Sequence, residues 1–143
     1  MAKTAPAQAM FSEQTGPGPV VAVALHQGHD LRPEIATSSA LDEATRLREE
    51  DPYTGKWAEI APTRLVALRS RFEVDLNRPR DNAVYKDAED AWGLQPWTEP
   101  PGDDVVAQSL EVWDSFYDRL REILTEKEKK YGRFVVLDLH SYN

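Results

Sequence analysis

The stretch VVAVAL at residues 20–25 decides the fold. It is a continuous apolar run that follows the turn-forming residues GPGP, and such a run is typical of a strand buried on both faces of a sheet. A second run, RFVVLDL at residues 133–139, has the same character. Between them, residues 103–130 carry apolar side chains at helical spacing and predict one long amphipathic helix that ends at Gly132. A strand, a crossover helix and another strand predict an α/β fold with a mixed, mostly parallel sheet flanked by helices.

Shorter segments extend this α/β pattern at both ends of the chain. Residues 1–19, rich in Ala, Pro and Gly, are expected to form a flexible amino-terminal arm, and residues 20–143 to form the amino-terminal part of one domain whose fold is incomplete at the carboxyl terminus. Residues 38–51 predict a helix capped by Ser38 or Ser39. The apolar stripe expected on the long helix consists of Val106, Leu110, Trp113, Tyr117, Leu120 and Leu124.

The middle of the chain is less regular. TRLVAL at residues 63–68 and RFEVDL at residues 71–76 predict a pair of strands or one bent strand. A long loop rich in proline follows, and Trp92 and Trp97 are expected to anchor it to the body of the protein rather than to bind a ligand.

Composition limits the classes of function. The net charge of −8 and pI of about 4.9 argue against a nucleic-acid partner, which would require clustered Lys and Arg. The chain has no cysteine, so a metal site would have to use His and carboxylate ligands. No segment approaches the roughly 20 apolar residues of a membrane span. We therefore expect no membrane association and a cytoplasmic location, while the oligomeric state stays open.

The three histidines are candidate metal ligands. His26 and His29 follow the first apolar run, and His140 follows the last. The carboxyl ends of strands in an open α/β sheet are where sites form, and three protein ligands with one open position are typical of catalytic zinc. Asp30 and Asp138 would be available to orient the imidazoles. The alternative is that each histidine is an ordinary surface or capping residue.

The segment SRFEVDLNRPR at residues 70–80 is a candidate anion-binding segment. Arg78 could fork onto a carboxylate with Asn77 beside it, while Arg71 and Arg80 add positive charge in an otherwise acidic protein. Together with a metal, these residues favour a small anionic substrate whose carbonyl is polarised. The alternative is a charged, solvated turn.

Several motifs, in order, resemble those of the N-formylglutamate amidohydrolase family. They are VVAVALHQGHDLRPE, EEDPYTGKW, SRFEVDLNRPR, AWGL and VVLDLHSYN, which extend from about residue 20 to residue 143. The tetrapeptides DLNR and DLHS also resemble those of zinc carboxypeptidases and of the aspartoacylase and succinylglutamate desuccinylase group. The resemblance implies a zinc-exopeptidase-like (phosphorylase/hydrolase-like) fold.

The resemblance also implies roles for individual residues. His26 and His140 match the first and third zinc ligands of the wider group, and His29 stands where that group has a glutamate. Asn77 and Arg78 match the pair that holds the substrate carboxylate. Arg71 lies near the arginine that stabilises the oxyanion, although it is not in register with it.

The implied activity is zinc-dependent hydrolysis of an N-acyl amino acid, with N-formylglutamate converted to glutamate and formate, a step of histidine degradation. A carboxypeptidase or another N-acyl amino acid deacylase would use the same residues. The general base of the wider group, a glutamate well beyond the third ligand, has no counterpart in this sequence. We therefore expect the amino-terminal part of a longer enzyme, nearly inactive alone. The alternative from another class is a non-catalytic half-domain that binds a partner.

Overall fold

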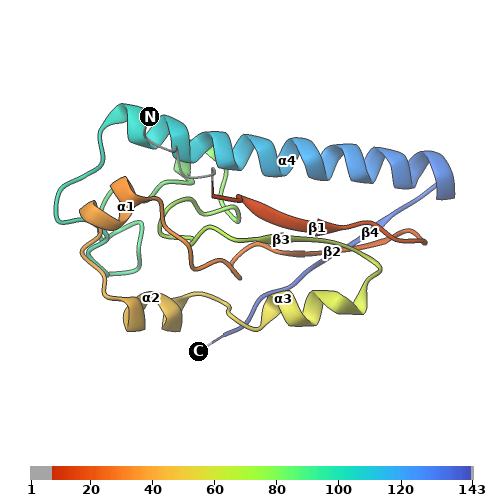
Figure 1. Ribbon diagram of the computed structural model, residues 1–143, viewed down its shortest axis with the longest axis horizontal. Coiled ribbons are helices and arrows are strands. Elements are labelled where there is room, and N and C mark those ends of the chain that lie inside the picture. The colour runs from red at the N-terminus through yellow and green to blue at the C-terminus, as the bar shows by residue number, and fades with distance from the viewer. Residues whose placement is uncertain (1–7, 143) are drawn as a thin grey trace, which may run out of the picture.

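A four-stranded mixed sheet forms the centre of the computed structural model, which describes residues 8–142 (Figure 1). The strand order is β1-β3-β2-β4. β2 pairs in parallel with both β3 and β4, and β1 pairs antiparallel with β3. The expected mixed, mostly parallel sheet flanked by helices is therefore confirmed. The strands are β1 (Phe11–Gln14), β2 (Val20–Ala24), β3 (Thr63–Ala67) and β4 (Val135–Asp138).

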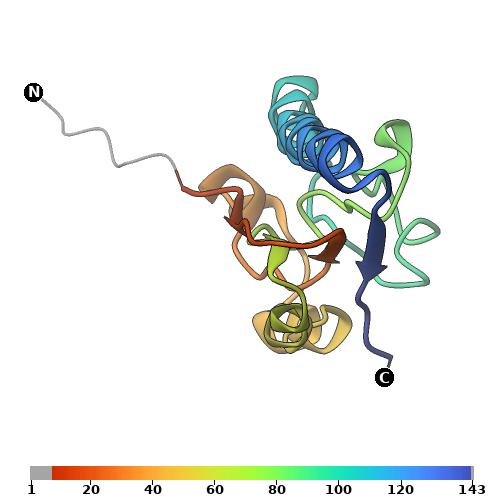
Figure 2. The ribbon, with the colours of Figure 1, turned by 90° about the vertical axis from the view of Figure 1, so that its right-hand side faces the viewer.

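β2 is buried on both faces, as its continuous apolar sequence predicts. Val21 and Val23 belong to the core cluster that includes Phe116 of the long helix α4 (Asp103–Tyr131). Ala22 and Ala24 belong to a second cluster on the other face. Its other buried members come from the 3-10 helix Ala58–Ile60, which follows α3 (Thr54–Trp57), and the residue after it. Figure 2 shows the resulting layers, with α4 on one side of the sheet and α3 on the other.

The long helix α4 begins and ends where the sequence predicts. Gly132 ends it with a φ of +73° and donates its N–H to the Glu128 carbonyl, so a residue without a side chain is favoured there. The buried line is shifted by about one residue from the expected stripe and consists of Ser109, Val112, Phe116, Leu120, Ile123 and Lys127. The stripe is shifted because two of its expected members, Trp113 and Tyr117, end in polar N–H and O–H groups. Trp113 and Tyr117 lie at the flank, where they donate hydrogen bonds to the carbonyls of Arg78 and Leu76.

The amino-terminal region differs from expectation in two places. Residues within the expected flexible arm form β1, while residues 1–7 of that arm lie outside the described part. The helix expected over residues 38–51 is shorter and forms α2 (Glu43–Glu49), and a separate helix that was not expected, α1 (Pro33–Ser38), precedes it. The cap of α2 is Asp42, whose carboxylate accepts the Thr45 N–H at 2.7 Å, rather than Ser38 or Ser39.

RFEVDL does not form the expected strand. The Ser70 carbonyl accepts the N–H groups of Glu73 and Val74, which makes a turn. Residues 72–76 are all buried, including Glu73 and Asp75. Both acids face buried or half-buried partners instead of water, so the segment is buried at successive positions and lacks the solvent-exposed face that its alternating sequence predicts. The loop that follows contains a 3-10 helix, Arg80–Asn82. Trp97 anchors it by donating to the Tyr85 carbonyl at 2.7 Å.

Among the helices of residues 8–142, none combines the length and the apolar character that a membrane span requires.

Candidate metal centre and substrate pocket

The parallel pairing of β2 and β4 places two of the three histidines side by side. His26 and His140 each follow the carboxyl end of their strand by two residues. The backbone hydrogen bond from Leu139 N–H to the Val23 carbonyl continues the ladder to this point at 3.0 Å. The two imidazole rings lie 5.0 Å apart, centroid to centroid.

Asp51 is the third member of this group. Its N–H donates to the His26 carbonyl at 2.8 Å, which ties the segment after α2 to the end of β2. Its Oδ2 lies 3.5 Å from His26 Nδ1 and 3.3 Å from His140 Nδ1. Each of the three residues offers a ligand atom, and these atoms all lie within 4.8 Å of one another. Two imidazoles and one carboxylate at this spacing are a donor set suited to zinc.

A carboxylate lies behind each of these imidazoles. His26 Nε2 is 2.6 Å from Asp75 Oδ1. His140 Nε2 is buried and 2.9 Å from Asp138 Oδ1, without the alignment of a hydrogen bond. Because the Nε2 atoms face these carboxylates, the Nδ1 atoms are directed toward Asp51. Carboxylate-backed imidazoles are the usual arrangement of metal-ligating histidines, so the residues fit a bound zinc ion.

Asp75 joins the candidate metal ligands His26, Asp51 and His140, called here the metal group, to the rest of the site. It accepts the Asn77 N–H at 2.8 Å, an Arg71 N–H at 3.2 Å and the Tyr85 hydroxyl. Burial alone would raise the pKa of the Asp75 carboxyl, but His26, followed by Arg71 and Tyr85, outweighs burial and holds that pKa well below its usual range. Burial, followed by the Asp75 charge, raises the pKa of the Tyr85 hydroxyl, which therefore remains a donor. Asp75 is thus a buried anion at neutral pH.

Asp75→Asn keeps the size of the side chain but removes the negative charge behind His26. We expect zinc affinity to fall by roughly 10- to 100-fold, the usual effect of losing a partner behind a metal-ligating histidine. Competition against a chromophoric chelator measures this change. Asp30→Asn is the matched control, because Asp30 is exposed and its backbone bonds to Leu68 and Ser70. An unchanged affinity in Asp75→Asn would contradict the role of this carboxylate.

His29 is not part of the group formed by His26, Asp51 and His140. Its Nδ1 lies 2.5 Å from Glu50 Oε2, and its Nε2 lies 3.3 Å from Glu43 Oε1. The separation begins at Gly28, where an added Cβ would lie 2.2 Å from the Arg69 carbonyl oxygen. This close approach turns the loop so that His29 faces α2. The structure therefore brings Asp51 to His26 and His140, in the place that the sequence had suggested for His29.

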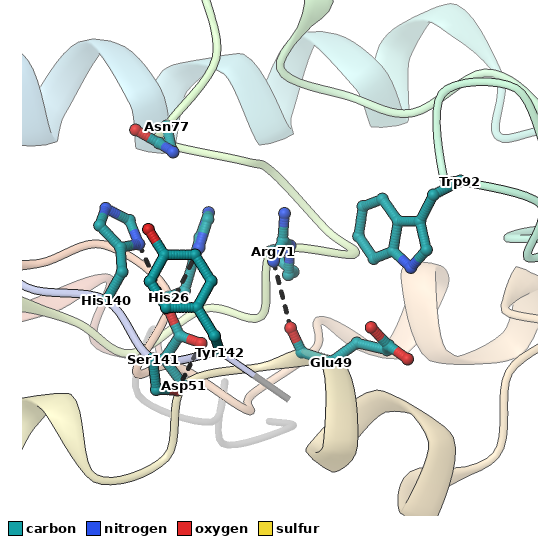
Figure 3. Close-up of a pocket in the computed structure, with 9 residues that line it drawn as sticks. All are labelled: His26, Glu49, Asp51, Arg71, Asn77, Trp92, His140, Ser141 and Tyr142. Atoms are coloured by element: carbon teal, nitrogen blue, oxygen red, sulfur yellow. Dashed lines mark hydrogen bonds and ion pairs between the residues drawn. The ribbon is translucent and has the colours of Figure 1, made fainter.

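A cavity of about 420 Å³ opens beside the metal group (Figure 3). His26, Asp51 and His140 lie at one end, Arg71 in the middle and Trp92 at the other end. Its wall consists of His26, Glu49, Asp51, Arg71, Asn77, Trp92, His140, Ser141 and Tyr142.

The four sequence-predicted anion-binding residues divide into two pairs. Arg71 and Asn77 line the cavity. Arg78 lies outside its wall, donates to the Asp90 carbonyl at 2.5 Å and stacks over the Tyr85 ring at 4.5 Å. Arg80 is bound to Asp114 of α4 through two hydrogen bonds of 2.7 and 2.9 Å. The structure thus brings Arg71 and Asn77, but not Arg78 or Arg80, to the same cavity as the metal group.

Known proteins share this sequence and this architecture. The family model described as N-formylglutamate amidohydrolase matches residues 18–143. A protein of Pseudomonas aeruginosa named N-formylglutamate deformylase is 28% identical, over 92% of this chain and 55% of its own. The crystal structure of N-formylglutamate amidohydrolase from Ralstonia eutropha JMP134 superposes with a TM-score of 0.80 at 18% identity, over 94% of this chain and 59% of that one. A gene product of Agrobacterium tumefaciens gives a TM-score of 0.75 at 20% identity, over 94% and 57%.

The chain therefore spans between half and three-fifths of the length of these relatives. The two structures support the fold, and the family model covers nearly all of the chain. The resemblance noted in the motifs is confirmed. This chain belongs to the N-formylglutamate amidohydrolase family.

Proposed function

We propose that the chain provides the metal-binding residues and part of the substrate-binding wall for hydrolysis of the amide bond of an N-acyl amino acid. N-Formylglutamate, which would give glutamate and formate, is the first substrate to test, because it is the substrate in the names of two relatives. The observation that carries the proposal is that His26, Asp51 and His140 share one cavity with Arg71.

The metal in this proposal is zinc, held by His26, His140 and Asp51. When bound, zinc acts as a Lewis acid that polarises a carbonyl and makes water more acidic. The protein contributes orientation. Asp75 and Asp138 lie behind the imidazoles, and the Ser141 hydroxyl donates to Asp51 Oδ1 at 2.8 Å.

Arg71 is the group that we assign to the negative charge of the substrate. Three of the five N–H donors of its guanidinium are used, by the Tyr85 hydroxyl, the Glu49 carbonyl and Asp75. Two donors remain for a ligand. The resemblance suggested that Arg71 stabilises the oxyanion and that Arg78 holds the carboxylate. Because Arg71 lines the cavity and Arg78 does not, we assign the carboxylate to Arg71, with Asn77 nearby.

Zinc-dependent formate release from N-formyl-L-glutamate tests the proposed activity. N-Acetyl-L-glutamate and a dipeptide with a free carboxyl terminus are the competing substrates, since another deacylase or a carboxypeptidase would prefer one of them. We expect formate release to exceed that of the His140→Ala variant, which lacks a proposed ligand. A rate that is the same in both proteins would exclude catalysis by this site.

Arg71→Lys should raise the dissociation constant for N-formyl-L-glutamate by about tenfold or more, because lysine keeps the charge but loses the planar fork. Calorimetry on the zinc-loaded chain measures this constant. Arg78→Lys is the matched variant and should change it much less. An equal rise for Arg78→Lys would return the carboxylate to Arg78, as the motif resemblance had implied.

A further inference from the structure

Trp92 has an unusual backbone conformation for a large side chain. Its φ is +44°, and among residues 8–142 it is the non-glycine residue with a positive φ. The turn is closed by Gly93 N–H to the Ala88 carbonyl at 2.7 Å and by Leu94 N–H to the Ala91 carbonyl at 2.8 Å. A bulky residue in this region is strained, and such strain is concentrated at functional sites.

Burial does not account for tryptophan at this position. The side chain is 45% exposed, and it lines the cavity at the end opposite the metal group (Figure 3). Its ring has aromatic neighbours in Phe72 at 5.9 Å and Tyr85 at 5.8 Å. The guanidinium of Arg71 stacks over the ring, with its Cζ 4.6 Å from the ring centroid. The ring therefore covers the guanidinium that we assign to the substrate.

Two kinds of contact fix the orientation of the Arg71 guanidinium in two different ways. The hydrogen bonds to Tyr85, Glu49 and Asp75 fix the guanidinium within its own plane. The indole of Trp92 covers one face of that plane and opposes tilting. All N–H bonds of a guanidinium lie in its plane, so the two remaining donors are held in a fixed direction.

We propose that Trp92 is a positioning residue for Arg71: its indole holds the guanidinium plane so that the two remaining donors meet an anionic group of the substrate. This inference rests on the proposed function, in which Arg71 binds that group. It explains why the chain keeps a strained, half-exposed tryptophan at the far end of the cavity.

The test compares two substitutions of Trp92 by titration calorimetry. Trp92→Asn removes the ring, while asparagine tolerates a positive φ. We expect it to weaken binding of N-formyl-L-glutamate and of succinate by about tenfold, a typical effect of losing a partly desolvated cation–π contact. Trp92→Phe keeps an aromatic face and should stay within about threefold of the original protein. Trp57→Asn is the matched control, because Trp57 is 49% exposed outside the cavity wall and should leave binding unchanged.

A double-mutant cycle separates positioning from simple packing. In an Arg71→Ala background, Trp92→Asn should change binding of either ligand by less than about twofold, because the group that it positions is gone. An equal fold-change in the dissociation constant in both backgrounds would overturn the inference, because Trp92 would then contribute to binding independently of Arg71. If Trp92→Asn loses cooperative unfolding, Trp92→Gly replaces it in the same cycle, since glycine also lacks the ring and adopts a positive φ without strain.

The two ligands distinguish the inference from the proposed substrate. Succinate binding with the expected order of variants, but no binding of N-formyl-L-glutamate, would overturn the substrate and support the role of Trp92. Absence of binding for both ligands would overturn both.

Discussion

His26→Ala and His140→Ala should each lower the affinity of the chain for zinc by more than about 100-fold, beyond the range typical of losing an outer partner. Asp51→Ala should do the same. The three residues offer ligand atoms within 4.8 Å of one another, so removing one leaves two donors. Zinc bound per chain and competition with a chromophoric chelator measure the effect, with one zinc expected for each unsubstituted chain.

His29→Ala is the control for the metal prediction. It removes the same ring three residues from His26, but from a histidine whose nitrogens face Glu50 and Glu43. Zinc affinity should stay within a few-fold, although some stability is lost because Glu50 is buried. If His29→Ala were as damaging as His140→Ala, while Asp51→Ala had no effect, the ligand set would be the three histidines.

The elements that could be predicted from the sequence are those whose pattern of buried residues is evident from the apolar residues of the element itself. β2 is apolar at every position and is buried on both faces, and α4 has a helical apolar period and a glycine at its end. RFEVDL was misassigned because Phe72, Val74 and Leu76 follow the alternation of a strand. The intervening Glu73 is equally buried, because it binds Arg32 and Arg69. Arg32 is distant in the sequence, and Arg69 lies on the far side of the turn at Ser70, so no local sequence pattern indicates these partners.

The ligands of the candidate metal centre could likewise be predicted from the sequence only in part. His26 and His140 could be found because each follows a strand, and parallel pairing brings the ends of such strands together. Asp51 is one of 25 acidic residues and lies in the motif EEDPYTGKW, where two further acids, Glu49 and Glu50, precede it and no local feature distinguishes the ligand. Its place in the site is set by contacts that are distant in sequence, namely the backbone hydrogen bond to His26 and the hydrogen bond from the Ser141 hydroxyl. The exclusion of His29 depends on how closely Gly28 packs against Arg69, which the spacing of the histidines does not reveal.

Turnover of N-formyl-L-glutamate by these residues alone should be slow, about 10²- to 10⁴-fold below that of the Pseudomonas aeruginosa deformylase under the same conditions. Hydrolysis needs a group that takes a proton from water, and the described carboxylates near the metal already have partners. Asp51 belongs to the metal group, and Asp75 and Asp138 lie behind its histidines. Glu49 is the remaining carboxylate of the cavity wall, and its Oε1 lies 3.3 Å from Arg48 Nε.

Formate release with saturating zinc, measured for both proteins in parallel, decides this prediction. The binding tests of Arg71 and of the zinc ligands distinguish slow turnover from a failure to fold. A chain that binds zinc and substrate is folded, so slow turnover in that chain would indicate that a proton acceptor is missing. Turnover comparable to that of the relative would mean that the acceptor lies within this chain. Glu49→Gln would then be the first variant to examine, since an amide in that position cannot accept the proton and the rate should fall by the same 10²- to 10⁴-fold.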